Sequence, residues 1–399
     1  MKFKLDINRI SYICIVVGYI LTLTTIPQGE EFGNIFVNIG LFLALYKIFF
    51  LNSYTFKQMI LFGIIGTILF VVSYQTRNYQ FMYTFIFALS ATKMSMDKLI
   101  DIDLIVRIPL VFIVCALGYS GIILNRVDDD FRGLGLVRKS LGFSHPNNLG
   151  VMMMIITIYL FYKKHKHFAI RDYLLLLFAD YICWSVAISR TSSIVITTVI
   201  AVELLDSVIT ALFHRYSLEK FKQIVMIIGS AFTLIIPLGS VYLGINYSAT
   251  PFYLAVDSVL NSRVYLMNTA FRNNGIPLWG QYIKVTSWAS NVIAEETNAI
   301  DNLYGYILIN FGAIFFGLCV LALFISFIYA YKKGEWAVCL CILFFIAAGF
   351  CENKMFYLGV NAFTVYIAVA FYQSSRRIRY REHSRLRRKK EMLGEKVNG

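Results

Sequence analysis

Long apolar stretches separated by short polar or charged segments make up most of this chain. A helix needs roughly 20 mostly apolar residues to cross the hydrocarbon core of a bilayer. No intervening segment is long enough for a soluble domain of ordinary size. The pattern therefore predicts an all-α, polytopic integral membrane protein with about twelve transmembrane helices, the first of them an uncleaved span. We place the spans at about 10–26, 32–51, 58–73, 79–93, 104–124, 147–162, 173–188, 191–213, 223–244, 303–330, 336–350 and 355–373.

The positions of Lys and Arg predict how these spans are oriented. Short cytoplasmic loops are enriched in both residues, and threading from a cytoplasmic N-terminus places the main basic clusters inside. These clusters are Lys163, Lys164, Lys166 and Arg171; Arg215, Lys220 and Lys222; Lys332 and Lys333; and the C-terminal tail. Both termini are then cytoplasmic, and two long segments lie outside, at about 125–146 and 245–302. We divide the chain into a membrane-embedded domain, residues 1–373, and a basic cytoplasmic tail, residues 374–399.

Composition and charge support this class and exclude others. Hydrophobic residues make up 58% of the 399 residues and charged residues 15%, which is too little charge to cover a soluble domain of this size. Half of the net charge of +14 lies in the tail, where ten Lys and Arg accompany three Glu. Such a tail suits the anionic cytoplasmic face of a bilayer, so we expect no nucleic-acid partner. The seven cysteines form no disulfide framework or metal-ligand spacing, and we expect no metal or other cofactor.

Four ionisable residues fall inside predicted spans: Arg107, Asp180, Glu203 and Asp206. A charge at membrane depth costs about 2.5–3.5 kcal/mol or more, so each is a functional candidate. A structural role competes with that interpretation for Arg107, Glu203 and Asp206, because these three lie where they can reach cytoplasmic water. Asp180, in mid-span, is the least easily explained in this way.

The second outer segment has an amphipathic pattern. Plotted at about 100° per residue, residues 252–271 place apolar side chains on one face and polar side chains on the other, as in a helix at the membrane surface. Arg263 interrupts the apolar face. A guanidinium in that position either snorkels to water or binds an anion.

Other outer residues add to a candidate anion site. Arg190 occupies a very short outer turn, where it serves either as an interfacial anchor or as part of an anion clamp. The first outer segment contributes Arg138 and Lys139 and ends near His145, the outer histidine. Pro146 can begin the following helix, and the polar run around it is expected to line the outer mouth of the bundle.

These residues suit a transfer from a diphosphate. Arginine binds phosphate oxygens through charge-assisted, often bidentate hydrogen bonds, and a carboxylate or imidazole can take a proton from an attacking hydroxyl. Outer carboxylates are available at Glu295, Glu296 and Asp301. The sequence contains no nucleotide-binding phosphate loop and no zinc-protease or serine-hydrolase motif.

Several short motifs resemble, in the same order, those of oligosaccharide repeat-unit polymerases. These are the Wzy-type capsule or O-antigen polymerases, which are relatives of the O-antigen ligases. The size, number of spans, large late outer loop and basic tail are also similar. The motifs are Phe143-x-His145-Pro146-Asn147-x-Leu149-Gly150, Ser189-Arg190-Thr191, Ser262-Arg263, and Asp301-Asn302-x-Tyr304 followed by Asn310-Phe311-Gly312.

The resemblance implies a metal-independent, inverting glycosyltransferase with a GT-C-like membrane fold. It would transfer a growing glycan from undecaprenyl diphosphate onto an incoming lipid-linked repeat unit, at the outer face of the cytoplasmic membrane. Arg190 and Arg263 resemble the diphosphate-binding arginines of the family. Asp301 stands where ligases carry a histidine base, so we expect Asp301 to be the base, with His145 second; Ser262 replaces the glycine of many relatives. Expected substrate contacts are Arg138, Lys139, Asn147, Asn148, Arg272, Asn302 and Tyr304.

The expected partners are the undecaprenyl-diphosphate-linked oligosaccharide, the lipid bilayer, a flippase and a chain-length regulator. Other functions stay open: a ligase that moves the same glycan to a different acceptor, a lipid-linked oligosaccharide flippase or other transporter, and a membrane-anchored sensor or scaffold. A transporter is expected to carry charges along mid-membrane paths in both halves, whereas the candidates here gather on the outer side.

Overall fold

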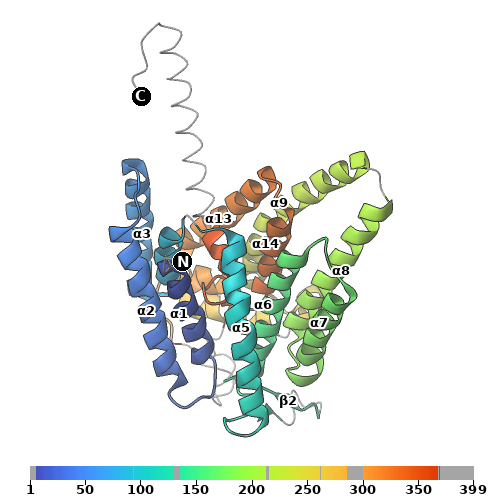
Figure 1. Cartoon of the computed structure of the whole chain (residues 1–399). Helices are drawn as coiled ribbons and strands as arrows, with labels where there is room; N and C mark the ends of the chain where they lie inside the picture. The colour runs from blue at the N-terminus through green and yellow to red at the C-terminus, as the bar shows by residue number, and fades with distance from the viewer. Residues whose placement is uncertain are drawn as a thin grey trace, which may run out of the picture.

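The computed structural model describes residues 6–92, 94–128, 135–212, 215–260, 262–284, 300–366 and 368. The chain is mostly helical, and its long helices stand side by side (Figure 1). The α-helices are α1 (Ile7–Thr22), α2 (Gly29–Phe50), α3 (Phe56–Thr76), α4 (Gln80–Ser90), α5 (Met96–Tyr119), α6 (Pro146–Lys164), α7 (Ile170–Tyr181), α8 (Arg190–Leu212), α9 (Arg215–Ile245), α10 (Pro251–Val259), α11 (Arg263–Asn274), α12 (Leu303–Tyr306), α13 (Gly312–Lys332) and α14 (Trp336–Gly349). Two π-helical segments, η2 (Ile182–Val186) and η5 (Ile307–Phe311), a 3₁₀ helix, η6 (Ala362–Val365), and an antiparallel pair of short strands, β1 (Val127–Asp128) and β2 (Arg138–Lys139), complete the described elements.

Five of the described helices are long and apolar enough to cross a membrane. Large apolar side chains on their surfaces are exposed, such as Phe42 and Phe70, as expected for helices that face lipid rather than water. These helices agree with the predicted all-α, membrane-embedded protein. The five are Gly29–Phe50, Phe56–Thr76, Arg190–Ile209, Gln223–Ile245 and Leu303–Lys332, and shorter apolar helices lie at Ile7–Thr22, Gln80–Ser90 and Trp336–Gly349.

The range 355–373, predicted as the last span, has a different structure over its described part. Residues 350–361 form turns, and the short helix η6 follows them. Leu358 is 2% exposed and Val360 is fully buried, so the apolar side chains of this segment pack inside the protein. Beyond residue 368 the range, like the predicted tail, lies outside the described residues.

Helix α6 is the most enclosed of the long helices, and it contacts α5, α7, α8 and α14. Beside it, α5 carries a fully buried ion pair, in which Arg107 Nε lies 2.5 Å from Asp103 Oδ1. Asp103 also accepts a hydrogen bond from Tyr12 Oη, and Arg107 donates to the carbonyl of Gly359 at 2.8 Å. The pair therefore ties α5 to α1, through Asp103, and to the turn that follows α14, through Arg107, which is a structural role.

The other charges inside predicted spans also have partners. Asp180 accepts hydrogen bonds from the hydroxyls of Ser193 and Thr197 on α8. Glu203 accepts from the backbone N–H of Lys166 and lies 2.7 Å from His165 Nδ1, whose Nε2 is 3.8 Å from Asp206. These contacts favour structural roles for the three carboxylates.

The amphipathic helix predicted over residues 252–271 is wrong as a single element. The structure has two helices here, α10 and α11, separated by a break at which Ser262 adopts a left-handed backbone (φ +61°). The predicted faces fail as well, because Val259 is 75% exposed whereas Asp257 is 7% exposed. Asp257 is buried because it accepts hydrogen bonds from the backbone N–H groups of Val264 and Tyr265 at the start of α11.

One end of the bundle, the lower end in Figure 1, gathers the turns at 23–28, 120–128, 135–145 and 187–189. We call it the loop end. The α1–α2 turn is fixed there, because Thr25 N donates to Gly142 O at 2.9 Å and Ser144 N donates to Leu23 O at 2.8 Å. The first predicted outer segment, at about 125–146, thus packs against the α1–α2 turn.

Candidate functional site

Arg263 is the first residue of α11, and the left-handed turn at Ser262 directs its side chain back into the protein, where it is 11% exposed. A positive φ of this kind costs glycine little, whereas Ser262 adopts it with a side chain. Arg263 Nη1 donates a 3.0 Å hydrogen bond to Thr191 Oγ1. We predicted Arg263 on the apolar face of a surface helix. Its side chain is instead buried against α8.

Two carboxylates flank the same guanidinium. Arg263 Nε lies 3.7 Å from Asp301 Oδ2, and Arg263 Nη2 lies 3.7 Å from Glu352 Oε1. Burial by itself lowers the pKa of Arg263, but Glu352 and Asp301 raise it above its ordinary value, so the guanidinium stays charged. We call Arg263, Thr191, Asp301 and Glu352 the Arg263 cluster. Its members come from four separate parts of the chain.

The turn that precedes Arg190 and Thr191 is held against the first turns of α6. Helix α7 passes into the π-helical segment η2, and Ile188 then takes a positive φ before α8 begins at Arg190. A Cβ on Gly150 would lie 2.5 Å from Ser189 Cβ, so only glycine allows this approach. The two motifs that contain Gly150 and Ser189 thus meet in the fold.

The Asn310-Phe311-Gly312 motif forms the end of η5 and the start of α13. Gly312 has φ +88°, and a Cβ on it would lie 2.6 Å from the backbone N of Gly280. The backbone N–H of Gln281 donates to Asn310 O at 2.8 Å. This motif therefore anchors the segment after α11 to the helix that follows Asp301.

His145 lies at the N-cap of α6, and its Nδ1 accepts a hydrogen bond from the backbone N–H of Asn147 at 3.1 Å. Although His145 is exposed, desolvation and the nearby Arg138 lower its pKa, which favours the neutral ring. A neutral imidazole with one accepting nitrogen carries its proton on the other. His145 therefore presents Nε2–H, a donor, to its surroundings.

Arg138 and the asparagines of the same motif form a small network beside His145. Arg138 is 6% exposed on β2 and donates to Asn147 Oδ1 at 2.7 Å. Asn148 Nδ2 donates to Ser144 Oγ at 3.0 Å. Arg138 also acts electrostatically on Glu352, so the short hairpin borders the Arg263 cluster.

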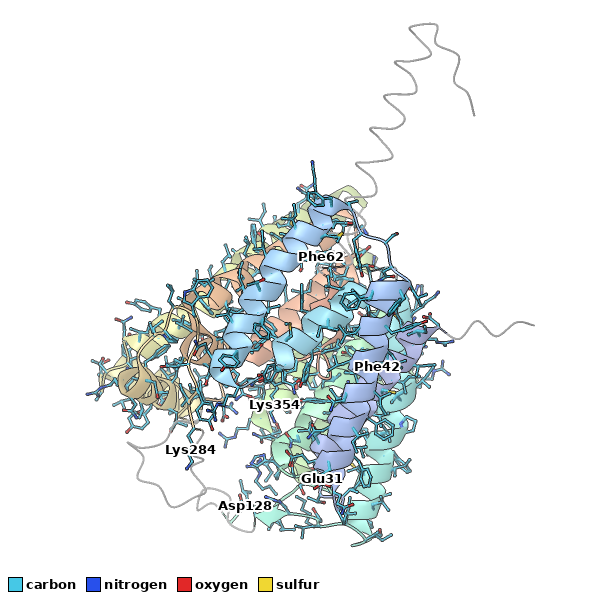
Figure 2. All side chains as sticks on the ribbon, turned by 90° about the vertical axis from the view of Figure 1, so that its left-hand side faces the viewer. Glu31, Phe42, Phe62, Asp128, Lys284 and Lys354 are labelled. Atoms are coloured by element: carbon cyan, nitrogen blue, oxygen red, sulfur yellow. The ribbon has the colours of Figure 1, made fainter. Side chains whose placement is uncertain are left out.

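Glu352 and Lys354 were not predicted as site residues. They lie in the turn after α14, and Figure 2 shows Lys354 near the middle of the molecule, above Lys284 and Asp128 in that view. Burial and Asp301 raise the pKa of Glu352 to about 7, against the opposing effect of Arg263. Burial also lowers the pKa of Lys354. The sequence feature that could have indicated Glu352 and Lys354 is the charged tetrapeptide Cys351–Lys354 between two apolar runs.

Some predicted substrate contacts have internal roles instead. Asn302 is 2% exposed and caps α12 by accepting from the N–H groups of Tyr304 and Gly305. Tyr304 is 1% exposed and donates to Ile346 O at 2.6 Å. Both side chains thus stabilise the fold next to Asp301.

Other predicted residues lie near the cluster without joining it. Arg190 is exposed, adjacent to Thr191, and forms no ion pair with the described residues; Lys139 is exposed on β2. Arg272 is exposed on the last turn of α11, about 13 Å along the helix axis from Arg263 at 1.5 Å per residue. Glu295 and Glu296 lie outside the described residues.

The site as a whole attracts anions. Arg263 lies 3.7 Å from both Asp301 and Glu352, and Arg138 and Lys354 act electrostatically on Glu352. Arg190, next to Thr191, is exposed and forms no ion pair with the described residues. Among the described residues, no group of three or more His, Cys, Asp or Glu is arranged to hold a metal ion. The arrangement can bind a phosphate-bearing group and place it beside a buried carboxyl.

No protein-family model, curated protein or solved structure matches this chain.

Proposed function

We propose that this protein is an oligosaccharide repeat-unit polymerase. It joins undecaprenyl-diphosphate-linked oligosaccharides at the outer face of the cytoplasmic membrane by inverting glycosyl transfer, with the diphosphate as leaving group. The proposal rests on one observation above all: Arg263 bonds to Thr191, next to Arg190, and lies between Asp301 and Glu352. Motifs far apart in the sequence, and similar to those of the polymerases, thus come together at one end of an apolar helical bundle.

The cations of the site suit a diphosphate. Arg263 presents a planar fork of donors, which matches phosphate oxygens better than an ammonium does. Arg190, exposed and adjacent to Thr191, is proposed to bind the second phosphate, and Lys354 adds a cation that acts electrostatically on Glu352. Developing negative charge on the leaving diphosphate is stabilised by such preorganised donors.

The remaining parts of the proposal concern the membrane. We infer about twelve crossings in a GT-C-like arrangement, with both termini in the cytoplasm and the loop end outside. The isoprenoid chain lies in the bilayer beside the bundle, which leaves the diphosphate at the interface, level with the loop end. A flippase that delivers repeat units and a chain-length regulator are the proposed protein partners.

The test is polymerisation by the purified full-length protein in lipid nanodiscs. The probe is a synthetic undecaprenyl-diphosphate-linked oligosaccharide that has the structure of the host's polysaccharide repeat unit, and no metal is added. A ladder of lipid-linked products at multiples of the repeat unit supports the proposal. If the substrate stays unpolymerised by protein that is folded and monodisperse, the polymerase assignment is wrong.

The same assay distinguishes a polymerase from a ligase. With a second, non-identical acceptor present, a ligase transfers the glycan once to that acceptor and builds no ladder. The polymerase builds the ladder with the lipid-linked repeat unit as sole substrate.

A further inference from the structure

We propose that Glu352, rather than Asp301 or His145, accepts the proton of the attacking sugar hydroxyl. This inference rests on the proposed polymerase function and identifies a residue for it that the motifs did not indicate. It concerns the turn after α14, whose residues have no part in the sequence resemblance.

Two hydrogen bonds hold the turn that carries Glu352 in place. Asn353 Nδ2 donates to Ile300 O at 2.7 Å, and Asn302 Nδ2 donates to Phe350 O at 2.8 Å. These hydrogen bonds clamp the turn onto the segment that carries Asp301. A base must be positioned to within a fraction of an ångström to be effective, and this clamp provides the positioning.

The carboxyl of Glu352 is enclosed but incompletely bonded. Its side chain is 16% exposed, and Oε1 is buried without a hydrogen-bond partner among the described residues. The nearest cation is Arg263, 3.7 Å from that oxygen, beyond hydrogen-bond distance. A buried carboxylate oxygen in this state gains from a proton or from a hydroxyl donor. The exposed part of the side chain is where an acceptor hydroxyl can approach the carboxyl.

The surroundings set the proton affinity of Glu352 near neutrality. Burial, followed by the charge of Asp301, raises its pKa, and Arg263, Lys354 and Arg138 oppose the rise, with a result of about 7. A general base is most effective when its pKa lies near the working pH. The groups that face Glu352 are Arg263 on α11, Asp301 before α12, Arg138 on β2, Tyr19 on α1, and Cys351 and Lys354 on its own turn.

The two predicted bases are less suited to this step. His145 uses Nδ1 as an acceptor for Asn147 N–H and therefore presents a donor. Asp301 is 53% exposed, so water competes for its carboxylate. Asp301 instead acts as a positioning residue, which holds Arg263 and raises the proton affinity of Glu352.

The step balances without a co-reactant. The hydroxyl oxygen of the acceptor sugar forms a bond to the anomeric carbon of the donor. The bond between that carbon and the diphosphate oxygen breaks, and the diphosphate leaves with the electron pair. The hydroxyl proton passes to the Glu352 carboxylate and is released to water after the product departs.

The experiment measures initial polymerisation rates against pH from 5.5 to 9 in nanodiscs, at equal amounts of folded protein. The wild-type rate is expected to rise with pH and to level off above about 7. Glu352→Gln is expected to lower kcat by about 10²–10⁴-fold, with KM little changed and the rising limb lost. Glu352→Asp retains a carboxyl and part of the rate, with the limb present. Glu30→Gln, an exposed carboxyl on the first turn of α2, is the matched control and keeps the wild-type profile.

Asp301→Asn provides a second test that Glu352 is the base. Loss of its negative charge should move the rising limb to lower pH without abolishing it. A Glu352→Gln variant with wild-type kcat, or a limb that persists in Glu352→Gln and disappears in Asp301→Asn, overturns the assignment to Glu352. Absence of polymer from the wild type at every pH overturns the polymerase proposal itself. If Glu352→Gln fails to fold, Glu352→Asp decides, and a wild-type rate and profile from it counts against Glu352.

Discussion

Thr191 Oγ1 accepts a 3.0 Å hydrogen bond from Arg263 Nη1, although 72 positions of sequence separate the two residues. The bond joins the first turn of α8 to the first turn of α11. It places Arg263 beside the residue that follows Arg190, and these two arginines from distant motifs form the proposed anion clamp.

We predict that Arg263→Lys and Arg190→Lys both lower polymerisation while the protein still inserts. A lysine ammonium is a point charge and cannot replace a bidentate fork on phosphate. A charge-assisted hydrogen bond contributes about 1.5–3 kcal/mol, so we expect rates about 10–100-fold below wild type in the nanodisc assay.

The matched control for the arginines is Arg171→Lys. Arg171 has a side chain that is 78% exposed and lies 3.9 Å from Asp172, away from the Arg263 cluster. Its substitution should leave the rate unchanged. Normal polymer length from both cluster variants would remove the diphosphate clamp from the proposal.

Topology gives a test that does not depend on substrate. Reporter fusions after Lys333 and at the C-terminus should report cytoplasm, and a fusion near Gly275, which follows α11, should report the outside. The basis is the excess of Lys and Arg in predicted inner loops. A cytoplasmic Gly275 would place Arg263 on the wrong side for an outer-face enzyme.

The raised pKa of Glu352 also predicts that the stability of the fold depends on pH. Its pKa is raised from 4.5 to about 7 in the fold, so the folded state binds this proton more tightly than the unfolded state does. Its contribution to the free energy of unfolding is therefore fully present below about pH 4.5 and is lost as the pH rises through about 7. Glu352→Gln removes this loss, at most on the order of 3 kcal/mol at 1.36 kcal/mol per pKa unit.

We accordingly expect Glu352→Gln to melt at a higher temperature than wild type at pH 8 and at nearly the same temperature at pH 5. The measurement is thermal unfolding in detergent, followed by tryptophan fluorescence, with Glu30→Gln as control. A lower melting temperature for Glu352→Gln at pH 8 would show that its pairing with Arg263 outweighs its burial.

Much of the helical layout follows from the sequence, because long apolar runs have few alternatives to a helix in a bilayer. Helices cover the predicted ranges up to residue 350 with modest shifts at their ends. The range that begins at Met355 was misjudged for a physical reason. Apolar content reports burial from water and does not distinguish a turn packed within the protein, as at Leu358, from a helix facing lipid.

The candidate site was predictable in part. Arg263 and Asp301 were expected near one another and lie 3.7 Å apart. Glu352 was missed because proximity across the fold cannot be read from a four-residue turn. The break at Ser262 was missed because helical periodicity carries no information about a single residue with positive φ, and that break is what turns Arg263 inward.

The last prediction concerns Gly150, where α6 meets the turn that precedes Arg190. An alanine Cβ there would lie 2.5 Å from Ser189 Cβ and 2.6 Å from Ser189 Oγ, so the turn must move. Overpacking of this kind costs about 1–3 kcal/mol, and the displaced turn also carries Thr191 away from Arg263. Gly150→Ala should therefore lower the melting temperature and reduce the polymerisation rate at equal folded protein. Gly63→Ala on α3, where an added Cβ meets nothing within 4 Å, is the control. It should keep the wild-type rate and a melting temperature no lower than wild type, because alanine favours a helix interior over glycine. If Gly150→Ala keeps both the wild-type melting temperature and the wild-type rate, the close packing of α6 on this turn does not position the arginines.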